Sequence, residues 1–389
     1  MSRIAYIQYT NPAGYPSLEH SSRMLADNGW TVLFFGTAVH RVESLHFPAH
    51  HNIVVRQLPP CHTGWRQKLH YVWFTVWAAF RTLWSGCSWA YASDPFACPV
   101  GLLLSCVPWI RIVYHEHDSP TPGSHESNGA PSRFLRFVLW TRRKLARRAV
   151  VCVLPNEQRA EQFTTEMGRD VHVVCVWNCP TEDEVSPSRP ALNGGDLWIL
   201  YHGSLVPSRL PTTVLEALAM LPERIKLRAI GYETAGHSGY LEELRALAAK
   251  LGISHRVEFV GTVSTRDELF ARCRQADVGL ALMPGTSHDI NEQAMTGASN
   301  KPFDYLACGL ALLVSDLPDW RSLYVENKLA LPVNPTDAVS IAAALRWLSE
   351  HPDELRSMGE RGRQRVLGQW NYEKQFAPVL RRLVGSPAD

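Results

Sequence analysis

Residues 299–316 read SNKPFDYLACGLALLVSD, and this stretch decides the fold. Polar residues able to cap a helix come first, and a short amphipathic segment with Asp304 follows. Gly309 then ends the helix, and the apolar run 310–314 predicts a buried parallel strand. A helix N-terminus with an acid one turn inside it suits a diphosphate and a ribose. An ordinary α/β crossover shows the same pattern, so these residues alone leave both interpretations open.

Strand-like and helix-like segments alternate on both sides of this stretch. In the first half, strands are expected at 3–8, 30–35, 52–57, 89–92, 111–114, 150–154 and 171–176, and helices at 17–27, 66–84, 132–148 and 156–166. In the second half, strands are expected at 197–201, 226–230, 256–260 and 278–283, and helices near 209–221, 240–251 and 267–275. This alternation predicts an α/β protein with two doubly wound parallel sheets and a ligand cleft between them.

Composition marks the domain boundaries. Residues 181–196 are rich in Pro, Gly and acid without periodicity, which is typical of a linker. We therefore expect a first domain at 1–180, a linker at 181–196, a second domain at 197–368 and a closing helix at 369–389. The first 180 residues hold 17 Lys and Arg against 11 Asp and Glu, a net charge of +6, and 9 of the 13 Trp. This half is expected to meet an anionic or amphipathic partner.

Cysteine usage and the N-terminus indicate a cellular compartment. The nine cysteines form no CxxC pair and no metal-ligand spacing, which is typical of reduced thiols in a cytoplasmic protein. The first residues lack the pattern of a secretory leader, and the most apolar stretch, 96–110, is too short to span a bilayer.

Three further clusters follow expected strands. Gly14 lies in TNPAGY after the first strand, His117 in YHEHD after the fifth, and Gly203, Ser204 and Arg209 in YHGSLVPSR after the first strand of the second domain. Glycine permits close approach to a ligand, histidine supports acid–base or hydrogen-bonding chemistry, and arginine binds phosphate. A plain turn, a polar surface turn and an exposed arginine remain the alternatives.

The motifs YHEHD, LPNEQRAEQF, YHGSLVPSR, VEFVGTV and SNKPFDYLACGLALLVSD together resemble family 4 of the retaining, nucleotide-sugar-dependent glycosyltransferases. That resemblance implies a GT-B fold, two facing Rossmann-like domains, over nearly the whole chain. It also implies a nucleotide-sugar donor as substrate, with no metal and no other cofactor.

The resemblance also implies residue roles. His117 takes the position of the active-site histidine near the transferred sugar. The donor diphosphate falls to Arg209 and Gly203. Ser204 stands where the family often has a second basic residue, and we expect Lys301 to compensate for it. The ribose falls to Asp304, the edge of the nucleobase to Gly261 and Val263, and the sugar and cleft loops to Gly14 and Asn300.

One departure concerns the E-x7-E motif of the family. Its first acid falls at Thr296, which carries no carboxylate, and its second is Asp304 rather than Glu. Nucleotide binding is therefore a firmer expectation than sugar identity. The expected function is transfer of a hexose to a hydroxyl of a glycan, lipid-linked or small-molecule acceptor. A non-catalytic nucleotide-sugar-binding partner and a nucleotide-sugar epimerase are the alternatives.

Two aromatic and basic segments concern the acceptor. Residues 132–148 hold seven basic residues and no acid, and residues 65–84 hold seven aromatic residues with three basic ones. Such helices suit peripheral contact with the inner face of a membrane, or else pack in the core with solvated charges. No nucleic-acid recognition module is visible.

Overall fold

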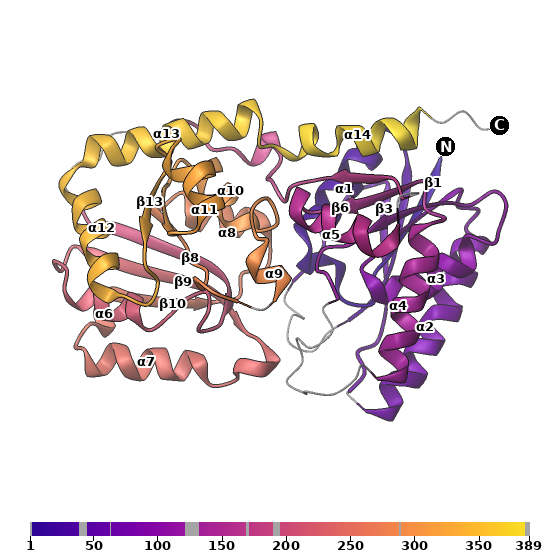
Figure 1. Ribbon diagram of the computed structural model, residues 1–389, viewed down its shortest axis with the longest axis horizontal. Helices are drawn as coiled ribbons and strands as arrows, with labels where there is room; N and C mark the ends of the chain where they lie inside the picture. Colours follow the sequence, from indigo (N-terminus) through magenta and orange to yellow (C-terminus); the bar gives the residue numbers. More distant parts are fainter. Residues whose placement is uncertain are drawn as a thin grey trace. The chain divides into compact units, whose positions relative to one another are not determined.

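The computed structural model describes residues 2–38, 45–62, 64–120, 132–168, 171–189, 195–287 and 289–385. The chain divides into two compact units. Unit 1 comprises Met1–Asn178, Asp289–Ala298 and Tyr372–Asp389, and unit 2 comprises Cys179–His288 and Ser299–Asn371. The two units are described in turn (Figure 1).

Unit 1 contains a seven-stranded parallel sheet with the order β3-β2-β1-β4-β5-β6-β7. The strands are β1 (Arg3–Ile7), β2 (Thr31–Thr37), β3 (Ile53–Leu58), β4 (Trp89–Ser93), β5 (Arg111–His115), β6 (Val151–Leu154) and β7 (Val173–Cys175). The helices are α1 (Pro16–Asp27), α2 (Trp65–Trp84), α3 (Cys98–Leu104), α4 (Arg133–Ala146), α5 (Glu157–Met167), α9 (Ile290–Gln293) and α14 (Tyr372–Val384).

Helices cover both faces of this sheet. The helices α2, α3, α4 and α5 share one apolar core with it, and α1 and α14 share the other. The sequence pattern does not predict α3, because its apolar stretch contains two prolines. Pro99 occupies the first turn of α3, where its missing N–H leaves no helical hydrogen bond unmade, so the helix tolerates it.

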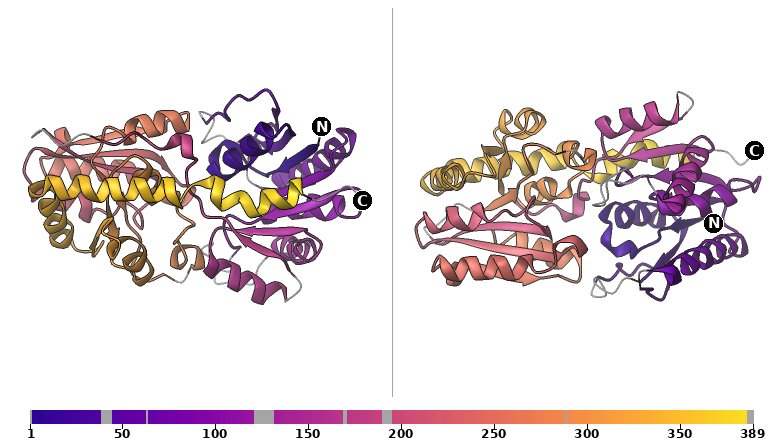
Figure 2. Two further views of the ribbon diagram at one scale, coloured as in Figure 1. Left: turned by 90° about the horizontal axis from the view of Figure 1, so that it is seen from above. Right: turned by 60° about the horizontal axis from the view of Figure 1, so that its bottom comes forward.

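Unit 2 contains a six-stranded parallel sheet with the order β10-β9-β8-β11-β12-β13. The strands are β8 (Leu197–Leu205), β9 (Ile225–Glu233), β10 (Val257–Gly261), β11 (Val278–Ala281), β12 (Ala311–Ser315) and β13 (Ala330–Val333). The helices are α6 (Thr213–Ala219), α7 (Tyr240–Lys250), α8 (Arg266–Cys273), α10 (Asn300–Ala307), α11 (Pro318–Trp320), α12 (Ala338–Glu350) and α13 (Pro352–Gly368), and they lie on both faces of this sheet (Figure 2). The predicted fold class, two parallel α/β sheets, is confirmed.

Within residues 299–316, the chain forms α10 and β12. Gly309 has a φ of +69°, a left-handed conformation that glycine adopts without strain after a helix. The strand β12 is fully buried between β11 and β13. Arg209 differs from expectation, because α6 begins only at Thr213 and Arg209 lies in a turn before it. Pro211 explains the delay, since proline disfavours helical backbone at the residue that precedes it.

Candidate functional site

Three residues that could contact a ligand lie at the carboxyl edge of the sheet in unit 1. Gly14 ends the short helix after β1, Asp94 follows β4, and His117 lies two residues beyond β5. The strands β1, β4 and β5 are neighbours in the sheet, and the chain reverses its winding direction between β1 and β4. Ligands of doubly wound sheets bind at such a switch point.

Two serine hydroxyls hold the buried imidazole of His117. Ser93 Oγ lies 2.9 Å from Nε2, and Ser17 Oγ lies 3.3 Å from Nδ1. The pKa of His117 is lowered to about 4, chiefly by burial; the charge of Asp118 opposes this shift and that of Arg159 adds to it. The ring is therefore neutral at physiological pH and is suited to hydrogen bonding.

Asp94 supports His117 from the end of the neighbouring strand. Its Oδ1 accepts a hydrogen bond of 2.9 Å from the backbone N–H of His117, and its Oδ2 accepts one of 3.2 Å from Gln8. Its φ of +65° is unusual for a residue with a side chain and indicates local strain. Burial, and then the charge of Asp118, raise the pKa of Asp94 to about 7.

The residue between the two histidines points away from this edge. Glu116 is fully buried and pairs with the guanidinium of Arg142 on α4, with an Nη2–Oε1 distance of 2.7 Å. Arg142 Nε and the hydroxyl of Tyr114 also donate hydrogen bonds to this carboxylate. The side chains of the HEHD sequence therefore point in different directions. Glu116 fixes α4 to the sheet, whereas His117 lies at the sheet edge.

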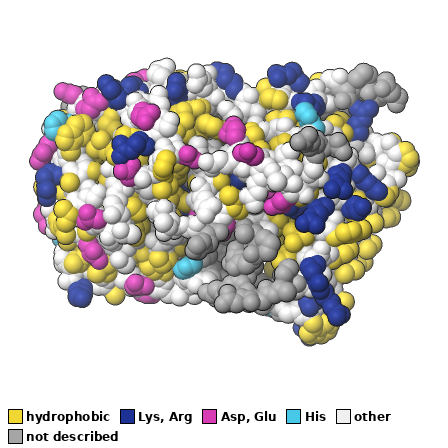
Figure 3. Space-filling view, in the orientation of Figure 1, with side chains coloured by type: hydrophobic (Ala, Val, Ile, Leu, Met, Phe, Trp, Pro, Cys, Tyr) yellow, Lys and Arg dark blue, Asp and Glu magenta, His cyan; other side chains and the backbone are white. Residues whose placement is uncertain are grey.

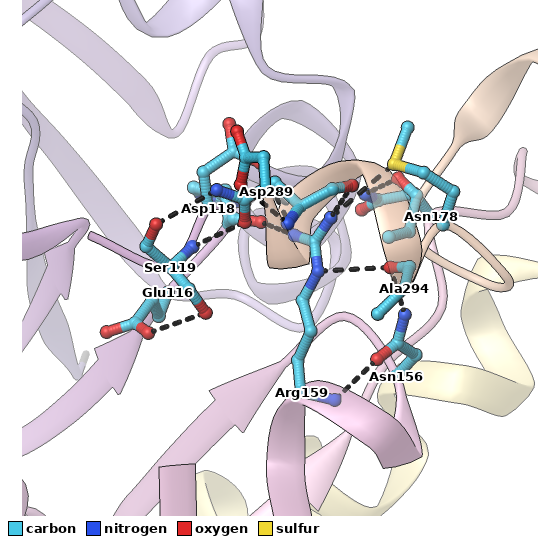
Figure 4. Close-up of polar contacts among 12 residues, drawn as sticks. Glu116, Asp118, Ser119, Asn156, Arg159, Asn178, Asp289 and Ala294 are labelled. Atoms are coloured by element: carbon cyan, nitrogen blue, oxygen red, sulfur yellow. Dashed lines mark hydrogen bonds and ion pairs between the residues drawn. The ribbon is translucent and has the colours of Figure 1, made fainter. Parts of the chain in front are cut away.

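Arg159 on α5 organises the surroundings of His117 in unit 1. It is 1% exposed, and its Nη1 donates a hydrogen bond of 2.7 Å to the backbone carbonyl of His117. The same guanidinium donates to the carbonyls of Asn291, at 2.9 Å, and Ala294, at 3.1 Å. Figure 4 shows Arg159 reaching from α5 to the backbone around Ala294. One side chain thus holds the loop of His117 and the segment Asp289–Ala298 together.

Other amides fix the rest of that segment. Asn156 Nδ2 donates to the carbonyls of Ala294, at 2.8 Å, and Thr296, at 2.7 Å, and Asn178 Nδ2 donates to Ala298, at 2.7 Å. Thr296 stands at the position of the first acid of the E-x7-E motif, and the hydrogen bond to its backbone carbonyl fixes its position.

In unit 2, the side chain of Lys301 lies against Gly203 near the end of β8, and the charge of Arg209 acts on Lys301. A Cβ atom on Gly203 would lie 2.6 Å from Cε and 2.9 Å from Nζ of Lys301, so a larger residue at this position would displace the amine. Burial, and then the charge of Arg209, lower the pKa of Lys301 to about 8, while Asp304 opposes the shift. Two close cations with one lowered pKa favour an anionic ligand.

Asp304 lies beneath these cations in a buried network. The residue is 0% exposed, its Oδ1 accepts a hydrogen bond of 3.0 Å from Arg266, and its Oδ2 accepts one of 2.9 Å from Asn300. Arg266 also pairs with Glu184, with an Nε–Oε1 distance of 2.6 Å. Burial lowers the pKa of the neighbouring His202 well below its usual value, so His202 adds no charge to this network.

The remaining predicted residues of unit 2 lie at the same edge of its sheet. Ser204 follows Gly203 in β8, and Gly261 ends the edge strand β10 with a φ of +81°. Val263 comes two residues after Gly261, and Asn300 begins α10. Because all six strands are parallel, their carboxyl ends share one edge.

Sequence reasoning missed Asp94, Asn156 and Arg159. The dipeptide Asp94–Pro95 at the end of a strand is a weak signal of a special turn. Asn156 and Arg159 lie in the quoted motif LPNEQRAEQF, but their partners are about 135–140 residues away in the sequence and no local pattern reveals them.

Comparison with known proteins fits this geometry. Residues 212–381 match the family model described as "Glycosyl transferase-like". The whole chain also superposes on a sucrose-phosphate synthase from Thermosynechococcus elongatus, with a TM-score of 0.72, 18% identity and coverage of 99% of this chain and 100% of that one. The chain has the GT-B fold, and its residues 212–381 are similar to glycosyl transferases.

Two further proteins are similar to this chain. The HepE protein of Anabaena, solved in complex with UDP-glucose, superposes with a TM-score of 0.72 at 15% identity, covering 99% of this chain and 100% of that one. A GDP-mannose-dependent alpha-(1-6)-phosphatidylinositol monomannoside mannosyltransferase of Mycobacterium tuberculosis is 29% identical over 188 residues, 47% of this chain and 46% of the relative. The match thus spans about half the length of this curated relative, and the structural likenesses show the fold.

Proposed function

We propose that the chain is a retaining glycosyltransferase that moves a hexose from a nucleoside diphosphate sugar to a hydroxyl of a glycan, lipid-linked or small-molecule acceptor. The observation that carries the proposal is the pair of cations in unit 2, with Lys301 against Gly203 and Arg209 acting electrostatically on Lys301. A diphosphate placed there relieves the repulsion between the two cations.

The donor is assigned to unit 2. Lys301, Arg209 and the N-terminus of α10 supply positive charge for the departing diphosphate, the kind of stabilisation that often dominates catalysis. We assign the ribose to Asp304 together with Asn300. Asp304 is shorter than the expected glutamate and is buried, and Asn300 donates a hydrogen bond to it. Gly261 and Val263 are assigned to the edge of the nucleobase.

The transferred sugar is assigned to His117 in unit 1. In the proposed reaction the bond from the anomeric carbon to the diphosphate oxygen breaks, and a bond to the acceptor oxygen forms on the same face. The acceptor proton passes to the leaving phosphate. Because its pKa is about 4, His117 contributes hydrogen bonds from a neutral ring. It transfers no proton in this scheme.

Thr296 supports a second candidate function, a binding protein for nucleotide sugars without turnover. Its side chain carries no carboxylate, and its backbone carbonyl is bonded to Asn156. Retention of donor affinity without hydrolysis or transfer is what this alternative predicts.

The test uses GDP-mannose and UDP-glucose, the donors named for the curated relative and for HepE. We expect the purified chain to bind one of them, to hydrolyse it slowly and to transfer its sugar with retained anomeric configuration, as read by NMR. The variant His117→Ala should keep nucleotide affinity and lose most turnover.

Lys301→Met should weaken binding of the free diphosphate, whereas Lys250→Met, an exposed change on α7, should not. Formation of an epimer of the donor, or affinity without any turnover, would overturn the proposed transferase. Full turnover by the His117 variant at saturating donor would overturn the role given to that residue.

A further inference from the structure

The outer surface of α2, α3 and α4 in unit 1 is apolar where a surface is usually polar. On α2 alone, six large apolar side chains are between 55% and 68% exposed: Trp65, Leu69, Val72, Trp73, Val76 and Phe80. We call the exposed surface of these three helices the α2–α4 face. A continuous apolar area of this kind marks an interaction site.

Both sides of α2 are apolar. Tyr71, Phe74 and Ala78 are buried against the core of unit 1, whereas Val72 and Trp73 are 61% and 58% exposed on the other side. A helix that is apolar all round is normally covered on all sides. None of the described helices is long and apolar enough to cross a membrane. Because Val72 and Trp73 are exposed, this side of α2 suits an apolar partner.

A groove runs through the α2–α4 face. It has a volume of about 730 Å³, within the range of small-molecule pockets, and α3 packs against both α2 and α4 at its floor. Val76, Leu103 and Phe137 are among its apolar lining residues, and Lys144 and Arg148 also line it. A largely apolar groove whose lining includes two cations matches a molecule that has an acyl chain and an anionic head.

The charge on the same face has one sign. The segments that form α2, α3 and α4 contain no Asp or Glu, and α4 exposes basic side chains that include Arg136, Arg143 and Lys144. In Figure 3, apolar and basic side chains gather together over α2 and α4. Exposed tryptophans such as Trp140, at 51%, and Trp84, at 76%, suit the boundary between water and lipid.

We propose that the α2–α4 face docks on an anionic lipid bilayer, with the groove taking lipid acyl chains and the basic residues of α4 taking headgroup phosphates. A second copy of this face carries the same positive charge and is a poor partner for it. A nucleic acid satisfies the charge but leaves the apolar area in water. The inference is independent of the glycosyl transfer proposed above, because it uses no residue of the candidate site.

The test is flotation of the purified chain with vesicles of phosphatidylcholine alone and of phosphatidylcholine mixed with phosphatidylglycerol. We expect the chain to float with the mixed vesicles, and high salt to weaken the association. Each basic residue near an anionic surface contributes about 1 kcal/mol, so Arg136→Gln and Lys144→Gln should each lower the partition coefficient by about fivefold. Lys250→Gln on α7 serves as the charge control.

A pair of matched substitutions separates lipid contact from general damage. Val72→Asp and Val339→Asp change valines that are 61% and 64% exposed, one on the α2–α4 face and one at the start of α12. We expect only Val72→Asp to abolish flotation, with both variants melting close to the parent. Failure of the parent to float, or equal flotation of the two variants, would refute the proposal. So would concentration-dependent dimerisation that Val72→Asp abolishes in a chain that does not bind vesicles.

Discussion

Replacing Arg159 by lysine tests whether one guanidinium organises the loop of His117. Arg159 spans three backbone carbonyls at 2.7–3.1 Å, those of His117, Asn291 and Ala294. Lysine keeps the positive charge, but its single ammonium cannot reproduce the planar fork that reaches all three. The substitution therefore changes geometry and not charge.

The magnitude follows from the burial of these groups. We expect lysine to keep one carbonyl and to lose two, and an unsatisfied buried polar group costs about 1–3 kcal/mol. A loss of about 3 kcal/mol in unit 1, which holds about 200 residues, corresponds to a fall of roughly 6–12 °C in its melting temperature. The larger local effect is expected in Asp289–Ala298, whose backbone the arginine holds.

Two measurements check this expectation. Thermal unfolding gives the stability, and hydrogen exchange followed by mass spectrometry reports protection in residues 289–298. Arg147→Lys is the matched control, because Arg147 is exposed and its Nε reaches one carbonyl, that of Met167, at 3.1 Å. Unchanged melting and unchanged exchange in the Arg159 variant would show that the guanidinium does not hold this segment.

Two further variants probe the predicted site. Gly203→Ala should lower affinity for nucleoside diphosphates at least tenfold by calorimetry, because the new Cβ would lie 2.6 Å from Lys301 Cε and the φ of +119° disfavours alanine. Gly195→Ala, an exposed position with no atom within 4 Å of the new Cβ, is the control. Asp94→Asn should become more stable relative to the parent as pH rises from about 4 to 7. The raised pKa of about 7 makes the folded parent bind a proton that the unfolded chain releases near pH 4, so the parent loses stability across that window. Parallel curves of melting temperature against pH for the two proteins would contradict this assignment.

The sequence predicts the two sheets because parallel strands buried on both faces read as short apolar runs, and these runs restart after residue 196. It places Gly203, Lys301 and Asp304 in one unit because strand ends and helix starts are local signals. It does not predict that Asp304 is buried under Asn300 and Arg266, since that depends on packing between α8 and α10.

The environment of His117 is even harder to predict from the local sequence. The strain at Asp94 is a backbone property imposed by tertiary contacts, and the dipeptide Asp94–Pro95 is only a weak signal of its φ of +65°. Arg159 reads as a helix-surface residue, because arginine in a first turn is usually solvated. Only the return of residues 289–298 to unit 1 explains its burial.

The pairing of Glu116 with Arg142 has a mechanical consequence. Both side chains are buried and joined by two parallel hydrogen bonds, so α4 cannot slide along the sheet without pulling the end of β5 with it. The next peptide carries His117. A displacement of α4 is therefore transmitted to His117 through one salt bridge and one peptide bond. The orientation of the imidazole thus depends on the position of α4.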